Sequence, residues 1–149
     1  FYASPRLSPD GTVLAFTRWN LPDMPWDSAT LNVASIGGDG ALSKPHTIAG
    51  DKNSSVFQPQ WSPDGHLYFT WDKGGWGGLY RWDGKRVSKV HGKNGWELWR
   101  AHWVFGTRCF AIGADGQLAT SAFDAGMPQL EIGQLSRGRA KSMERVPTS

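Results

Sequence analysis

The sequence lacks several features that would place it in a familiar functional class. A single cysteine, Cys109, excludes an internal disulfide framework. No run of 18 apolar residues is present, so we expect no membrane-spanning helix and no membrane partner. No serine has glycine both two residues before and two residues after it, so the nucleophile elbow of serine hydrolases is absent. No catalytic machinery can therefore be assembled from this chain.

Metal-binding patterns and a strong charge bias are absent too. The histidines show no zinc-ligand spacing, so we predict no metal site and no cofactor; they are His46, His66, His91 and His102. Sixteen basic residues against 13 acidic ones give a net charge of only +3, and no recognition helix or RNA-binding motif accompanies them. We interpret the charges as solvated surface and predict no nucleic-acid partner. Cys109 lies in a β-prone run and is interpreted as a buried small hydrophobic residue.

An internal repeat is the strongest positive feature. Ser8-Pro9-Asp10-Gly11 returns as Ser62-Pro63-Asp64-Gly65, and a weaker copy ends in Asp115-Gly116, so the Asp-Gly step recurs after 54 and 51 residues. A second landmark, leucine in a β-prone run, recurs at Leu31, Leu79 and Leu130, after 48 and 51 residues. Repeats of about 40 to 50 residues that carry strands are typical of β-propeller blades.

The repeated unit predicts a hairpin. Proline fixes φ at the first central position, and glycine takes the left-handed conformation that closes the turn. The expected structural turn residues are Asp10, Gly11, Asp64, Gly65, Asp115 and Gly116. Each turn precedes a β-prone run, so these aspartates are interpreted as turn formers and not as a calcium or catalytic array.

The resulting prediction is an all-β fold, a β-propeller segment of about three four-stranded blades that is part of a larger propeller. The blades are expected at about 1–50, 56–91 and 101–147. Their strands are expected at 3–7, 12–18, 31–36 and 46–49; at 57–61, 67–71, 79–82 and 86–90; and at 108–112, 117–123, 130–135 and 142–146. Since propellers close with about four to eight blades, open blade edges and self-association through them are expected.

Two connections, at 19–29 and 91–103, are longer than a tight turn between strands would need. In antiparallel blades, the loops after strands two and four emerge on the same face, opposite the Asp-Gly hairpins, so both connections should share one rim. Six of the nine tryptophans lie in or beside same-face loops, where they favour either a docking surface or packing. The candidate substrate-facing residues are Trp19, Asp23, Trp26, Asp27, Trp76, Trp96, Glu97 and Trp99. By contrast, Trp61, Trp82 and Trp103 are predicted to pack between blades.

The acidic residues on these loops suggest a specific role. Asp23, Asp27 and Glu97 could hold the α-ammonium group of a peptide through charge-assisted hydrogen bonds. The competing interpretation is that Asp27 only caps a turn beside Pro25 and Trp26. Both interpretations stay open at the level of sequence.

Several strings resemble the N-terminal propeller of bacterial prolyl oligopeptidase family (S9) serine peptidases. They are RLSPDG at 6–11, LPDMPWD at 21–27, FQPQWSPDGHLYF at 57–69, LYRW at 79–82 and WVFG at 103–106. Two departures stand out: Gly77-Gly78 replaces a bulkier pair, and Ala101-His102 stands where Pro-Gln is expected.

The resemblance implies a propeller that screens an α/β-hydrolase domain carrying a Ser-Asp-His triad, which lies outside this chain. Short peptides would be the substrates, and the hydrolase domain would be the partner. The alternative is a non-catalytic, TolB-like propeller that acts as a protein- or saccharide-binding scaffold. A Gly-x-Ser-x-Gly elbow in the coding sequence after Ser149 would favour the first interpretation, whereas an early stop codon would favour the second.

Overall fold

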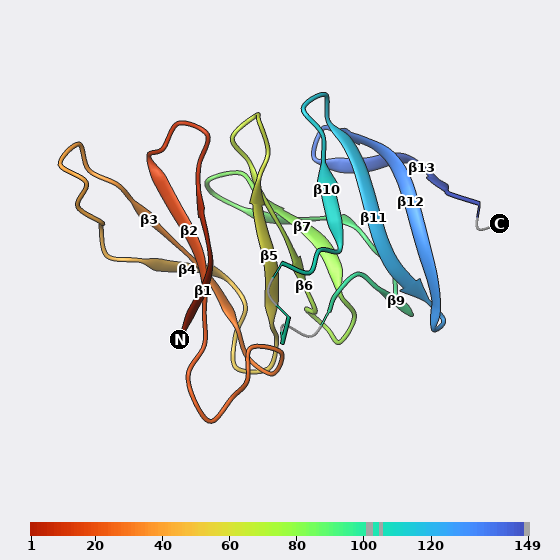
Figure 1. Cartoon of the computed structure of the whole chain (residues 1–149), viewed down its shortest axis with the longest axis horizontal. Coiled ribbons are helices and arrows are strands. Elements are labelled where there is room, and N and C mark those ends of the chain that lie inside the picture. Colours follow the sequence, from red (N-terminus) through yellow and green to blue (C-terminus); the bar gives the residue numbers. More distant parts are fainter. Residues whose placement is uncertain (101–102, 105, 148–149) are drawn as a thin grey trace.

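The structure, a computed structural model, describes residues 1–100, 103–104 and 106–147, and every regular element in these ranges is a β-strand. Three antiparallel sheets stand side by side (Figure 1). Blade one contains β1 Tyr2–Leu7, β2 Val13–Arg18, β3 Thr30–Ser35 and β4 His46–Ala49. Blade two contains β5 Val56–Trp61, β6 Leu67–Trp71, β7 Gly78–Trp82 and β8 Val87–His91. Blade three contains β10 Phe110–Ile112, β11 Gln117–Asp124, β12 Met127–Ser136 and β13 Arg139–Arg145, with β9 Trp96–Glu97 added beside β11.

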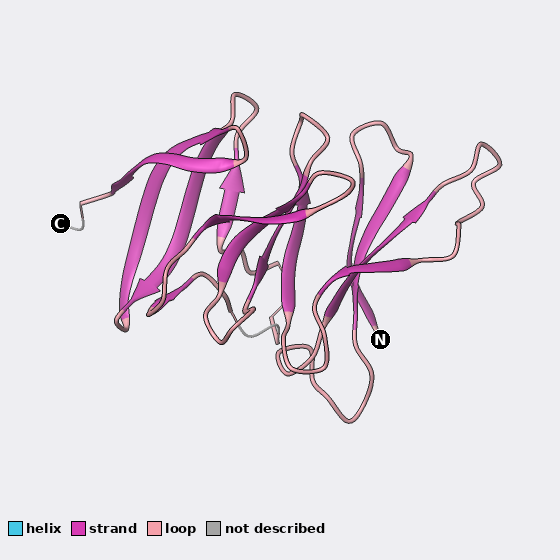
Figure 2. Cartoon of the chain, turned by 180° about the vertical axis from the view of Figure 1, so that it is seen from behind, coloured by secondary structure: helices cyan, strands magenta, loops and turns pink. Residues whose placement is uncertain are grey.

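Each blade runs in sequence order from its first strand to its last, and the same layering is seen from behind (Figure 2). This arrangement confirms the predicted all-β propeller segment. The described part of the chain contains no helix long and apolar enough to cross a bilayer.

The Asp-Gly hairpins join the first two strands of every blade. Gly11, Gly65 and Gly116 have φ values of 72°, 81° and 82°, which side chains with a Cβ rarely adopt. In the first copy the Gly11 N–H donates to the Ser8 carbonyl at 2.9 Å, and the Thr12 N–H donates to the Asp10 carboxylate at 3.1 Å. Proline fixes φ at the first central position, aspartate accepts a backbone hydrogen bond, and glycine supplies the positive φ.

Blade three departs most from its predicted strands. Strands β11 and β12 run to Asp124 and from Met127 because Ala125 and Gly126 form a two-residue turn with φ values of 50° and 81°. Arg137 and Gly138 make the same kind of turn before β13, which therefore starts at Arg139 instead of 142. Two positive φ values are the signature of the type I′ hairpin turn. Longer gaps between these strands were expected from the sequence, and this expectation was wrong. The short turns were not recognised because neither pair is the usual Asn-Gly or Asp-Gly.

The innermost strand of blade three is divided between two segments. Strand β10 covers only three residues, and the residues at the far end of β11, Phe123 and Asp124, pair with Glu97 and Trp96 of β9. Strand β9 was not predicted, because two residues within a long connection carry no periodic signal.

The core lies between the blades, where each sheet buries a face against the next. Strand β6 is buried along its whole length because blade two is the middle layer. Its alternate side chains separate accordingly: Leu67, Phe69 and Trp71 pack towards blade one, whereas Tyr68 packs towards blade three.

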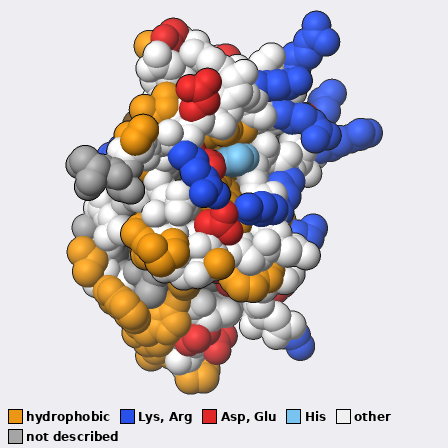
Figure 3. Space-filling model, turned by 90° about the vertical axis from the view of Figure 1, so that its right-hand side faces the viewer, with side chains coloured by type: hydrophobic (Ala, Val, Ile, Leu, Met, Phe, Trp, Pro, Cys, Tyr) orange, Lys and Arg blue, Asp and Glu red, His pale blue; other side chains and the backbone are white. Residues whose placement is uncertain are grey.

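Blade three has one covered face and one open face. Along β12 the exposed and half-buried residues alternate, and Leu130 and Ile132 on the open side are 45% and 48% exposed. Hydrophobic side chains gather on this end of the molecule, and Lys and Arg side chains follow one of its margins (Figure 3). Leu130 and Ile132 therefore leave apolar surface exposed on this face of blade three.

Hydrogen bonds also cross between blades. The Trp61 indole donates to the Arg6 carbonyl of blade one at 3.1 Å, and its ring meets Trp82 edge-on at 6.3 Å. The Gln58 side chain spans to blade three, donating to the Phe110 carbonyl at 2.7 Å and accepting from the Cys109 N–H at 2.6 Å.

Candidate functional site

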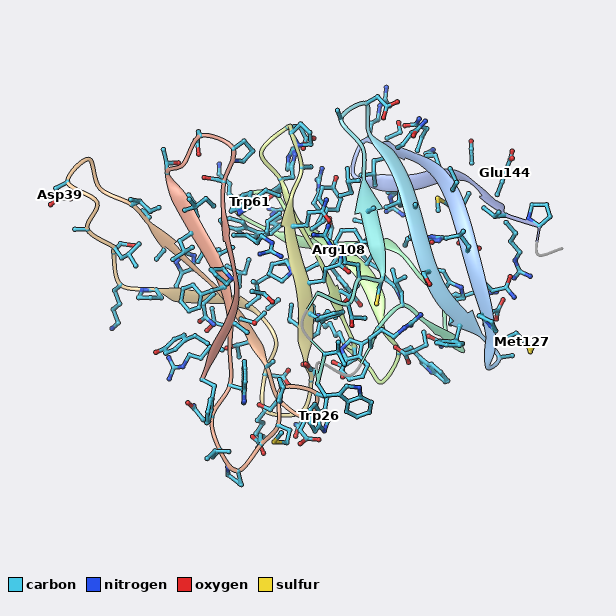
Figure 4. The ribbon with its side chains drawn as sticks, in the orientation of Figure 1. Trp26, Asp39, Trp61, Arg108, Met127 and Glu144 are labelled. Carbon is cyan, nitrogen blue, oxygen red and sulfur yellow. The ribbon has the colours of Figure 1, made fainter. Side chains whose placement is uncertain are left out.

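The two long connections meet at one end of the molecule. The rings of Trp26, from the β2–β3 loop, and Trp103, from the connection before β10, meet edge-on at 5.4 Å. Trp26 lies at the end opposite the loop that carries Asp39 (Figure 4). We call this end, which carries the 19–29 and 91–109 connections and the β6–β7 hairpin, the loop rim. Trp103 is 72% exposed, so the expectation that it packs between blades was wrong.

The β2–β3 loop ends in a short turn that Asp27 stabilises. The Asp27 N–H donates to the Met24 carbonyl at 2.9 Å, and the Met24 N–H donates back to the Asp27 carboxylate at 3.0 Å. Asp27 is therefore a turn cap, and it is exposed to solvent. Asp23 lines a separate hollow on blade one with Asn32 and Lys52.

Glu97 is fixed against the β6–β7 hairpin. Its Oε1 accepts the Gly77 N–H at 2.8 Å, and the Leu98 N–H donates to the Gly77 carbonyl at 3.0 Å. A Cβ on Gly77 would clash with the Trp99 Cβ and lie 3.0 Å from the Leu98 carbonyl carbon, so this position has no room for the bulkier residue expected there. Burial raises the pKa of the Glu97 carboxyl, although the Gly77 hydrogen bond acts in the opposite direction. Trp76, in the same hairpin, is 43% exposed.

The two remaining tryptophans of the second connection lie inward. Trp96 is 2% exposed and meets His91 edge-on at 4.6 Å within the core between blades two and three. Trp99 is half-buried and packs against the same core. Burial favours packing for this pair. The rings that remain accessible on or beside the rim belong to Trp19, Trp26, Trp76 and Trp103, and Trp19 stacks on Phe1 at 5.6 Å.

A small cavity lies behind the rim, between the innermost strands of blades one and two and the segment that precedes β10. It measures about 80 Å³ and is lined by Ser4 and Arg6 of β1, Gln58 of β5, Trp19, Pro25 and Arg108. Arg108 lies between β5 and β10 (Figure 4). Sequence reasoning did not select Arg6 or Arg108. Their signal was a basic residue on the predicted innermost strands of blades one and three, and innermost strands border the centre of a propeller.

The described residues offer little for direct chemistry. Within residues 1–100, 103–104 and 106–147, no three His, Cys, Asp or Glu side chains are placed to hold a metal ion. Burial raises the pKa of the Cys109 thiol to about 11, so the thiol stays protonated at neutral pH. His102 and Ala101 lie outside the described residues. The rim and the cavity are therefore suited to binding and positioning.

Comparison with solved structures identifies similar propellers. A crystal structure of puromycin hydrolase matches 99% of this chain at 30% identity with a TM-score of 0.85, and the chain spans 22% of that protein. A puromycin-hydrolysing peptidase of Mycobacterium tuberculosis matches 90% of the chain at 32% identity with a TM-score of 0.80. TolB from Acinetobacter baumannii, at 18% identity and a TM-score of 0.61, shares the fold. No protein-family model and no curated protein matches the sequence.

Proposed function

We propose that this chain, a propeller segment similar to those of prolyl oligopeptidase family peptidases, gates and positions short peptides for an α/β-hydrolase domain outside it. The observation that carries the proposal is the loop rim, where two long connections meet through Trp26 and Trp103 and where Glu97 is held against the β6–β7 hairpin. The similarity to puromycin hydrolase supports it across nearly the whole chain. Since the chain spans about a fifth of that protein, the hydrolytic activity itself is part of the proposal.

Recognition at the rim follows from the chemistry of its side chains. Accessible indoles supply rigid apolar contacts for peptide side chains. Each carboxylate can accept a charge-assisted hydrogen bond from a peptide α-ammonium group, contributing roughly 1.5 to 3 kcal/mol. Asp27 can do so while it caps its turn, because the residue is exposed and the cap uses one carboxylate oxygen. Glu97 is held in place by Gly77, so little side-chain freedom would be lost when a peptide binds.

The test uses the full-length enzyme that contains this chain. Asp23→Asn, Asp27→Asn and Glu97→Gln are each assayed with peptides that have a free or an acetylated N-terminus. Loss of an ammonium contact raises KM for the free peptide by roughly tenfold and leaves KM for the acetylated peptide unchanged.

Asp39→Asn is the matched control, because Asp39 accepts from the Ala41 N–H in a loop far from the rim. If all three rim variants keep the wild-type preference between free and acetylated peptides, these acids do not recognise the N-terminus.

A non-catalytic, TolB-like scaffold is the second candidate function. It is suggested by the fold shared with TolB, which matches 97% of the chain with a TM-score of 0.61. The coding sequence that follows Ser149 distinguishes the two. A Gly-x-Ser-x-Gly elbow within the next few hundred residues supports the peptidase, and an early stop codon supports the scaffold.

A further inference from the structure

Two arginines without acidic partners line the cavity behind the loop rim. Within the described part of the chain, the ion pairs join other residues, and neither Arg6 nor Arg108 contacts a carboxylate. No Asp or Glu belongs to the cavity lining. Two positive charges at one cavity, uncompensated by nearby carboxylates, favour an anionic ligand.

The cavity exists because the innermost strands of blades one and two are bulged at matching positions. Ser4 and Gln58 each precede a proline, and both have positive φ, 52° and 51°. The pairing register shifts there, between Ala3 and Arg6 in β1 and between Phe57 and Gln60 in β5. A β-bulge redirects side chains and is common next to functional sites. Here the bulges leave a hollow and not a flat sheet edge.

The two arginines are held differently. The Arg6 Nη1 donates to the Pro5 carbonyl at 2.8 Å, so one nitrogen is used and the rest of the guanidinium is available. Arg108 is exposed, and its backbone is fixed because the next residue, Cys109, donates to Gln58. Guanidinium groups bind carboxylates through two parallel hydrogen bonds, and this geometry suits a planar carboxylate.

The other residues that line the cavity indicate the chemistry of the ligand beyond its anionic group. Trp19, Pro25, Phe57 and Val104 provide apolar walls beside the arginines. A volume of about 80 Å³ admits a terminal group and not a whole peptide. An apolar residue that ends in a free carboxylate combines these requirements.

We propose that this cavity binds the C-terminal carboxylate of a short peptide whose last residue is apolar, with Arg6 and Arg108 as the carboxylate contacts. The proposal rests on the proposed peptide-positioning function. It adds a second anchor, so that rim and cavity together would select peptides by length. It does not depend on the rim acids, because those would contact the opposite end of the peptide.

The test uses the full-length enzyme that contains this chain, inactivated with a serine-directed reagent so that no peptide is cleaved. Calorimetry measures the binding of N-acetyl-leucyl-phenylalanine and of its C-terminal amide. Acetylation removes the ammonium group, so failure of the rim acids to recognise peptides does not affect the result. We expect saturable binding of the acid, with the amide weaker by roughly tenfold or more. Inorganic phosphate should compete poorly, since the apolar walls gain nothing from it.

Substitutions then locate the contacts. Arg108→Gln and Arg6→Gln should each lower the affinity for the peptide acid by roughly tenfold and leave the affinity for the amide unchanged. Arg108→Lys should have an affinity for the acid between those of the wild type and Arg108→Gln. Arg86→Gln, in the β7–β8 hairpin, is the matched control. Equal binding of acid and amide, no binding of the acid at millimolar concentration, equal competition by phosphate, or unchanged affinity in both Gln variants would overturn the proposal. The acid-to-amide comparison uses the unaltered chain, so it decides even if a variant fails to fold.

Discussion

At the scale of single residues, Gln58 illustrates how one side chain joins two blades. Its amide oxygen and nitrogen both bond to the backbone of the neighbouring innermost strand, at Cys109 and Phe110. The positive φ of Gln58 directs the side chain there. The sequence predicted the strand that contains Gln58 but not this role, because the bulge depends on tertiary contacts with blade three.

Replacing Gln58 by alanine should lower the free energy of unfolding by about 2 to 3 kcal/mol. The change leaves a buried donor and a buried acceptor without partners, each at a cost of about 1 kcal/mol or more. Urea unfolding followed by tryptophan fluorescence measures the difference. Gln117→Ala is the control, because Gln117 is exposed at the start of β11. Equal stability of the two variants would show that the bond between blades contributes nothing.

Cys109 provides a prediction about reactivity. Burial raises its thiol pKa to about 11 from an ordinary value of 9.0. Thiolate is the reactive form, so alkylation by iodoacetamide at pH 8 should be about 100-fold slower in the folded chain than in urea. Mass spectrometry after timed quenching measures both rates. Similar rates in the two conditions would mean that Cys109 is accessible.

At the scale of elements, the repeat predicts most of the structure. The strands at 46–49 and 67–71 lie at the predicted bounds, and most others differ by one or two residues. Ala125-Gly126 and Arg137-Gly138 escaped prediction because their turn geometry depends on strand pairing on both sides. At the candidate site, the shared rim followed from strand alternation. The burial of Trp96 did not, since it requires β9 to pair with β11.

The Asp-Gly hairpins should depend on glycine for backbone reasons alone. Gly65 has a φ of 81° and no atom near the position of a Cβ, so Gly65→Ala adds conformational strain without a clash. We expect a loss of about 1 kcal/mol in the free energy of unfolding. Thermal unfolding would show a melting temperature about 2 to 4 °C lower.

Gly38→Ala is the matched control for the hairpin. Gly38 also has open space around it, but it lacks the positive φ. A Gly65 variant as stable as the Gly38 variant would contradict the proposed turn mechanism.

At the scale of the whole molecule, the described residues form three stacked sheets. The chain has no Gly-x-Ser-x-Gly sequence, and its one thiol is buried. We therefore expect the isolated chain to leave peptide p-nitroanilides uncleaved. Turnover that survives purification and is blocked by a serine-directed inhibitor would contradict this expectation.

The most direct test of the three-blade account is sedimentation velocity on the purified chain over a concentration series, combined with thermal unfolding. The open face of β12 exposes Leu130 and Ile132, which in a closed ring would be covered by another blade. We predict that the average mass rises with concentration, or that the chain unfolds at low temperature with little cooperativity. Replacing both residues by lysine should reduce any association. A stable monomer that unfolds cooperatively at every concentration would contradict the account.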